Sequence, residues 1–229
     1  NKFLSPSYNE DEGFSIRLML EKGYFVYLPD ILIYGKDGPG LDALNCVHNA
    51  LDAVAGIRAI NKDKTGLTGF SFGGYETDFI ATHSDRFATY VSGAGHSDII
   101  KAYHAFNYNF MWPDYLRLEA SQYNMNKAFA EDKHLYFRNS PLIFAENVNA
   151  PILLWTGKDD QNISSDHSMA FYNALKRNGK AVIALFYNRE NHGLQNPEAQ
   201  QDLTSRILDW FDYFLHDETD CDWITKGLK

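Results

Sequence analysis

Cysteine, long apolar runs and positive charge are all scarce in this sequence of 229 residues. Its longest apolar clusters, 24–28 and 152–155, are strand-sized and fall well short of the roughly 18 residues that a membrane-spanning helix requires. Lys and Arg number 21 against 30 Asp and Glu, and the resulting net charge of −9 opposes binding to nucleic acid and to anionic membranes. We therefore expect neither an integral membrane protein nor a nucleic-acid partner.

Neither the two cysteines nor the start of the chain indicates where in the cell the protein is located. Cys46 falls within an apolar helical pattern, which favours a buried free thiol over a disulfide, and the only other cysteine is Cys221. The sequence begins at Asn1 with neither an initiator methionine nor a signal segment, which indicates a piece of a longer chain. The localisation, cytoplasmic or exported, is unknown from the sequence.

Short β-branched and aromatic runs alternate with helical patterns along the chain. Strands are predicted at 24–28, 65–70, 87–91, 152–155 and 182–186, and helices at 14–22, 41–60, 74–83, 166–176 and 197–216. This alternation is typical of an α/β fold with a mostly parallel sheet and helices on both faces. Residues of about 97–148 break the alternation, which predicts an insertion over one end of the sheet. We expect one domain over residues 1–229.

The strongest motif lies where the second predicted strand meets its helix. Gly69-Phe70-Ser71-Phe72-Gly73 matches Gly-x-Ser-x-Gly, the pattern of a nucleophilic serine on a sharp strand-to-helix turn. Side chains at the two glycine positions are predicted to collide across the turn that pushes Ser71 outward. The start of the helix offers free N–H groups and a positive dipole end to an oxyanion beside Ser71. This context favours a nucleophile over a merely glycine-rich turn.

A serine hydroxyl needs a base, and the base needs an orienting carboxylate. His192 lies between the last strand and the closing helix, as the order serine, acid, histidine requires. The turn at 69–73 is called the elbow below. His96 follows the strand after the elbow and is a candidate for lining a pocket. The acid is expected after 152–155, where Asp159 and Asp160 compete, and composition does not separate them. Four further histidines fall in predicted helices and are expected to be packing or surface residues: His48, His83, His167 and His216.

Three stretches, 69–75, 157–163 and 191–193, together resemble the catalytic domain of the prolyl oligopeptidase family of serine peptidases. The resemblance runs from Gly23 to the last helix, and the acid-to-histidine interval of 32 residues is typical of the dipeptidyl-peptidase branch. In that family the acid stands three residues after the loop glycine and three before a Val or Ile. The resemblance therefore selects Asp160, with Asp159 as the alternative.

The same resemblance implies an α/β-hydrolase fold, preceded by a β-propeller that restricts substrates to peptides. No propeller is present in this sequence. It also implies that three strands and a loop with an oxyanion tyrosine precede Asn1, and that one of these strands lies beside 24–28. The chain is thus expected to lack the first strands of its sheet. Only the backbone N–H of Phe72 remains assignable as an oxyanion donor, so we expect weak or absent turnover.

Candidates for a substrate pocket come from the elbow, the insertion and the loop 157–163, which carries the acid and is called the acid loop below. By position these are Phe72, which adjoins the nucleophile, His96, Ile99, and Ile163, which matches the family's residue after the acid. Two roles are open for the aromatic residues of the insertion, an apolar pocket wall or a lid packed on the core. They are Tyr103, Phe106, Tyr108, Phe110, Trp112 and Tyr115.

The sequence contains no Cys or His cluster at ligand spacing and no glycine-rich nucleotide loop, so no metal or cofactor is implied. The combined prediction is a serine peptidase that hydrolyses short peptides through an acyl-enzyme, with Ser71, His192 and Asp160 as triad. Two alternatives are a carboxylesterase with the same triad and a catalytically silent interaction module. An open sheet edge would also favour self-association into a homo-oligomer.

Overall fold

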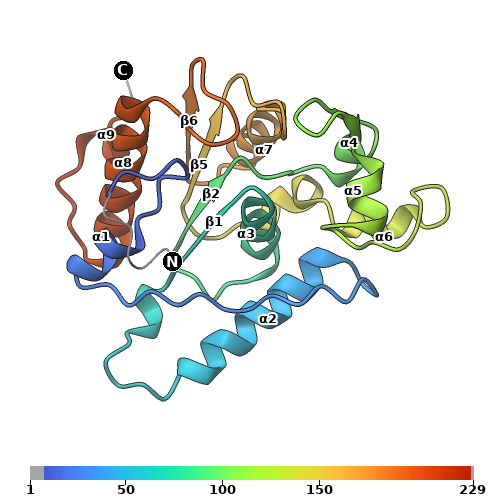
Figure 1. The fold of residues 1–229 in the computed structure, drawn as a ribbon. Helices are drawn as coiled ribbons and strands as arrows, with labels where there is room; N and C mark the ends of the chain where they lie inside the picture. The colour runs from blue at the N-terminus through green and yellow to red at the C-terminus, as the bar shows by residue number, and fades with distance from the viewer. Residues whose placement is uncertain (1–7, 228–229) are drawn as a thin grey trace.

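The computed structural model describes residues 8–227 and is centred on a four-stranded parallel sheet (Figure 1). Its strands are β1 (Gly66–Phe70), β2 (Thr89–Gly93), β5 (Ile152–Gly157) and β6 (Val182–Tyr187), in the order β1-β2-β5-β6. Each pair is parallel, so all four carboxyl ends meet at one edge of the sheet. The predicted α/β fold with a mostly parallel sheet is confirmed.

Helices cover both faces of this sheet, as predicted. On one face α2 (Pro39–Val54), α3 (Phe72–His83) and α7 (Asp166–Arg177) enclose an apolar cluster, which includes Phe79 and Phe171. On the other face lie α1 (Ile16–Glu21) and α8 (Pro197–Leu215), packed around a cluster that includes Trp155 and Trp210. Two further short helices are η2 (Lys62–Lys64) and α9 (Asp222–Thr225). The sheet is therefore held between two apolar layers.

The strand predicted at 24–28 is wrong, because that segment is extended without forming part of a sheet. Tyr24 N–H donates to the carbonyl of Met19 at the end of α1, and its hydroxyl donates to Asp212 of α8. A strand exists only where a neighbouring backbone completes its hydrogen bonds. Alternating aromatic residues predict an extended chain, but they do not supply this partner.

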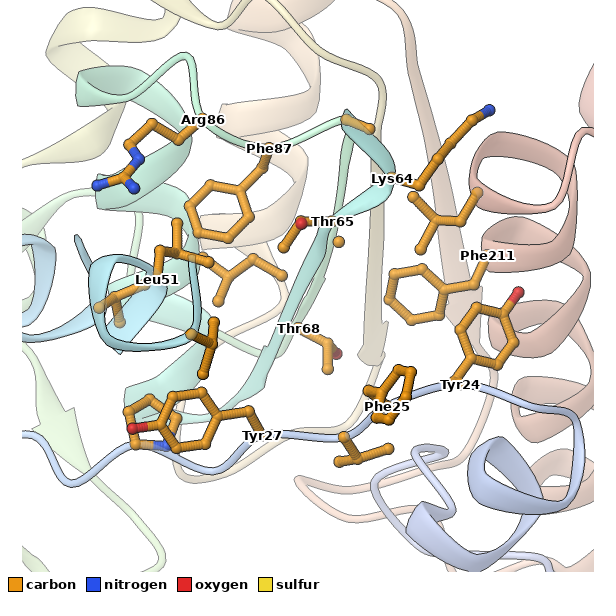
Figure 2. A pocket seen from close by; sticks show the side chains of 18 of the residues that line it. Tyr24, Phe25, Tyr27, Leu51, Lys64, Thr65, Thr68, Arg86, Phe87 and Phe211 are labelled. Atoms are coloured by element: carbon orange, nitrogen blue, oxygen red, sulfur yellow. The ribbon is translucent and has the colours of Figure 1, made fainter. Parts of the chain in front are cut away.

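A cleft of about 1190 Å³ separates this segment from β1 (Figure 2). Leu51 of α2 and Phe211 of α8 also line it. β2 pairs with only one side of β1, so the other backbone edge of β1 faces the cleft. All five β1 residues are consequently partly exposed, whereas those of β2 are all buried. Nearby, Phe25 is 68% exposed.

The segment between β2 and β5 packs as a lobe beside the sheet (Figure 1). It contains α4 (Ile99–Tyr103), a hairpin of β3 (Phe106–Asn107) and β4 (Trp112–Pro113), α5 (Tyr115–Ala120), α6 (Lys133–Arg138) and η3 (Pro141–Asn147). Its core contains Ile99, Tyr123 and Tyr136, packed against Tyr75 of α3. The aromatic residues of the hairpin region are exposed rather than packed as a lid: Phe106, Tyr108, Phe110, Trp112 and Tyr115.

The structure also bears on the predictions about membrane-spanning helices and about the two cysteines. Within residues 8–227, no helix has the length and apolar character needed to cross a bilayer. Cys46 and Cys221 are both free cysteines. The prediction that Cys46 is buried is wrong, because its place on α2 leaves it partly exposed.

Candidate functional site

Ser71 occupies a sharp turn between β1 and α3. Its φ of 62° and ψ of −115° fall in a region that non-glycine residues rarely adopt. The turn is held by a hydrogen bond of 2.8 Å from Ser71 N to Gly93 O, and Tyr75 N donates to Ser71 O to begin the helix. Phe72 is the first residue of α3, so its N–H has no acceptor within the helix. The backbone therefore presents the Ser71 hydroxyl beside a helix N-terminus.

The glycines of the motif differ in what their positions require. A Cβ at Gly69 would lie 2.1 Å from the carbonyl oxygen of Gly73, so the predicted collision occurs there. At Gly73 it would meet nothing within 4 Å, and the steric role predicted for that residue is wrong. The second crowded position is Gly74, where a Cβ would lie 2.4 Å from Gly93 O. The close approach of α3 to β2 explains this requirement.

We expect Gly69→Ala to lower the free energy of unfolding by about 1–3 kcal/mol, the usual range for forced overpacking. Gly73→Ala is the matched control and should change the free energy of unfolding by less than about 1 kcal/mol, since its methyl group enters open space. Urea denaturation followed by circular dichroism measures both. Equal destabilisation by the two variants would contradict the close approach at Gly69.

His192 and Asp160 complete a chain of contacts with Ser71. The Ser71 Oγ lies 2.7 Å from His192 Nε2, and His192 Nδ1 lies 2.7 Å from Asp160 Oδ2. The His192 ring packs against Phe70, with ring centroids 4.8 Å apart, and Phe70 stacks in turn on Trp155. The structure thus brings together a hydroxyl, an imidazole and a carboxylate that are distant in the sequence.

The two candidate carboxylates of the acid loop, Asp159 and Asp160, lie in different environments. The Asp160 side chain is 0% exposed, and its Oδ1 accepts hydrogen bonds from the N–H groups of Asn162 and Ile163, at 2.8 and 2.9 Å. Asp159 is exposed, and its N–H donates to the carbonyl of Glu190. Asp160 is therefore the one that contacts His192.

The loop that carries His192 is fixed by residues that the sequence analysis missed. The Asn191 Oδ1 accepts from the N–H groups of both Gln161 and His192, and so joins the acid loop to the histidine loop. The buried Glu190 carboxylate accepts from Gln195 N, at 2.6 Å. Gly157 allows this approach, because a Cβ there would lie 2.1 Å from Asn191 O. Gly157 and Asn191 both belong to stretches that resemble the family, whereas Glu190 lies outside them.

A buried polar cluster from the lobe borders the acid loop. Arg117 donates to Asp114 Oδ2 at 2.8 Å and to Asn162 Oδ1 at 2.9 Å. Its Nη2 also lies 3.4 Å from His96 Nε2, which must accept because a guanidinium only donates. His96 Nδ1 then donates to the Tyr123 hydroxyl, at 2.7 Å. Burial is the main cause that lowers the pKa of His96 well below its usual value, so the imidazole is neutral.

The four predicted pocket residues lie around this cluster and the elbow. His96, Ile99 and Ile163 are each at most 2% exposed, whereas Phe72 is partly exposed and packs edge-on against Tyr123. Their role in binding a substrate stays a prediction. In the described part of the chain, no group of three or more His, Cys, Asp or Glu side chains is placed to hold a metal ion.

A family model matches most of this chain. The model described as "Prolyl oligopeptidase family" matches residues 40–218, which span the elbow, the acid loop and the histidine loop. The chain belongs to the prolyl oligopeptidase family. Its α/β fold is likewise that of the family's solved peptidases.

Individual relatives are similar over most of this chain. Dipeptidyl-peptidase 5 of Porphyromonas gingivalis is 25% identical over 218 residues, covering 88% of this chain and 30% of the relative. An uncharacterized peptidase of Bacillus subtilis, YuxL, is 26% identical over 215 residues. The match covers 87% of this chain and 31% of YuxL. A solved acylaminoacyl peptidase of Pyrococcus horikoshii superposes with a TM-score of 0.69 at 25% identity, covering 87% of this chain and 31% of that chain. The chain thus spans less than a third of the length of these relatives.

Proposed function

We propose that this chain is a catalytic domain that hydrolyses short peptides through a serine acyl-enzyme. The observation that carries the proposal is the pair of 2.7 Å contacts joining Ser71 Oγ, His192 and Asp160 Oδ2. Membership of a peptidase family supports peptides as the substrate class. A solved relative described as an acylaminoacyl peptidase in complex with Z-Gly-Gly-Phe-chloromethyl ketone, 26% identical to this chain, gives further support.

The proposed reaction begins when Ser71 Oγ attacks the peptide carbonyl carbon and its proton passes to His192 Nε2. The backbone N–H of Phe72 donates to the oxyanion that forms. The C–N bond then breaks, and the proton on His192 passes to the leaving amine. Water, deprotonated by the same imidazole, then attacks the ester carbonyl carbon. The bond from that carbon to Ser71 Oγ breaks, the proton on His192 returns to Ser71 Oγ, and the carboxylic acid leaves. Asp160 accepts the Nδ1–H of His192 throughout, which holds the Nε2 lone pair toward Ser71.

A fluorophosphonate probe tests the proposal because it phosphonylates an activated serine. We expect one labelled site in residues 1–229, which peptide mapping by mass spectrometry locates at Ser71. Turnover of peptides is expected to be weak in the same chain. Among residues 8–227 the Phe72 N–H is the one oxyanion donor assigned, and one donor fewer costs about 100- to 1,000-fold. An unlabelled Ser71 would favour a silent interaction module. Labelling together with cleavage of esters but not of matched peptide amides would favour an esterase.

We also propose that residues 1–229 self-associate through the cleft beside β1. Within residues 8–227 no strand pairs with the outer edge of β1, and Phe25, Tyr27 and Leu28 are exposed nearby. Both observations support the proposal, because an open edge pairs readily with another chain. Sedimentation velocity should show a mass that rises with concentration. Phe25→Lys should shift the species toward the monomer. Met111→Lys should not, since Met111 is exposed but does not line the cleft. A monomer at every concentration would overturn the proposal.

A further inference from the structure

The lobe reaches the acid loop through four polar side chains that contact one another in a closed ring. Arg117 donates to Asp114 and to the Asn162 side chain, at 2.8 and 2.9 Å. The Asn107 amide closes the ring, because its Nδ2 lies 3.2 Å from Asp114 Oδ1 and 2.9 Å from Asn162 Oδ1. Asn107, Asp114 and Arg117 are each at most 5% exposed. Three members of the ring are therefore screened from water, whereas Asn162 is partly exposed.

Asn162 links this ring to the carboxylate of Asp160. Its side-chain oxygen accepts from Arg117, while its backbone N–H donates to Asp160 Oδ1 at 2.8 Å. The Asn107 amide also donates to the Asn162 carbonyl oxygen, at 3.1 Å, so the ring holds the residue by both main chain and side chain. A shift of the Asn162 main chain that follows the loss of Arg117 would move the N–H that orients Asp160.

A second contact joins the lobe to the same loop. Asn109 N–H of the hairpin donates to the carbonyl of Gln161, at 3.1 Å. This bond involves only backbone atoms, so a change of a ring side chain removes neither of its partners. Arg117 is the charged member of the ring that contacts the acid loop directly, and its fork-shaped guanidinium contacts Asn162 and Asp114 at once.

We infer that Arg117 is a positioning residue. It acts through Asn162 to hold the Asp160 carboxylate within hydrogen-bond distance of His192 Nδ1. The inference rests on the proposed peptidase function. Arg117 makes no contact with Ser71 or His192 and takes no part in bond breaking. Its effect should therefore fall on the rate of serine activation rather than on the binding of substrate.

Three variants of residues 1–229 test the inference: Arg117→Lys, Asn162→Ala and the two combined. Each single change is expected to slow phosphonylation of Ser71 substantially, up to about 100-fold, the cost of a misplaced catalytic group. On peptides the loss should appear in kcat, with little change in KM. The double variant should be no slower than the slower single variant, because both changes remove the same link. Multiplying losses would contradict action through Asn162.

Arg138→Lys is the matched control. Arg138 belongs to the same lobe but lies on the surface, in an ion pair with Asp37 at 3.2 Å. Its variant should label as fast as the unchanged protein. Equal labelling rates for the Arg117→Lys variant and the unchanged protein would overturn the inference while leaving the proposed function intact. An unlabelled parent protein would instead remove the proposed function.

A proton NMR measurement tests the positioning role without turnover. The His192 Nδ1–H bonded to Asp160 is expected to give a low-field resonance, assigned by its loss in His192→Ala. Arg117→Lys and Asn162→Ala should shift or broaden this resonance, and Arg138→Lys should leave it unchanged. An identical resonance in the Asn162→Ala variant, which retains the buried ion pair of Arg117 and Asp114, would overturn the inference.

Discussion

Replacing Asp160 by asparagine is expected to lower kcat/KM by about four orders of magnitude. Asp160 accepts the proton on His192 Nδ1, at 2.7 Å, so Nε2 faces the Ser71 hydroxyl with a lone pair. An amide can turn its N–H toward Nδ1, which stabilises the wrong tautomer of the imidazole. The base then presents a proton to Ser71 in place of a lone pair.

Asp159→Asn is the matched control for this variant. Asp159 adjoins Asp160 in the sequence, but its side chain is exposed and only its backbone contacts the histidine loop. We expect its kcat/KM to stay within about threefold of the unchanged protein, as for surface changes away from a site. Fluorophosphonate labelling rates and peptide hydrolysis provide the comparison. Equal losses in the two variants would remove Asp160 from its assigned role.

The fold of Asp160→Asn should be retained, which makes the comparison informative. The Oδ1 of asparagine can still accept from the N–H groups of Asn162 and Ile163, which Asp160 accepts now. Thermal unfolding followed by circular dichroism checks this. A large loss of stability would mean that the carboxylate mainly holds the loop.

Local motifs were enough to predict Ser71 and His192 from the sequence. The turn at Ser71 follows from neighbouring residues, because a strand, a serine between glycines and a helix stand in direct succession. The place of His192 between the last strand and the last helix predicts its role as the base. In both cases the information lies within a short stretch of chain, and the order of elements in a parallel sheet supplies the rest.

Features that depend on distant partners could not be predicted in the same way. The segment 24–28 has the composition of a strand, but no described backbone pairs with it as a strand. The ring around Arg117 joins positions 107, 114, 117 and 162, and none of these polar residues stands out in the sequence. Gly73 shows the opposite case, since its motif position suggested a collision that the path of α3 avoids.

The second large effect is expected at Asp78, which lies buried on α3. Its Oδ1 has no hydrogen-bond partner among residues 8–227, and burial raises the pKa of its carboxyl to about 8. Between the unfolded pKa near 4 and this value, the folded state binds the extra proton. Stability contributed by this group therefore falls as pH rises through that window. Glu76, with a pKa raised to about 7 by burial, contributes in the same direction.

Asp78→Asn removes the titration while nearly preserving the shape of the side chain. The free energy of unfolding of the variant, relative to the unchanged protein, should rise between about pH 5 and pH 8 by up to about 4 kcal/mol. Taking the difference cancels the opposite contribution of His96 and His167, whose pKa values are lowered by burial. Asp85→Asn, a change at an exposed carboxylate just after the same helix, is the matched control. Urea denaturation across this range measures both, and a flat difference for Asp78→Asn would mean that the buried carboxyl is solvated or paired in solution.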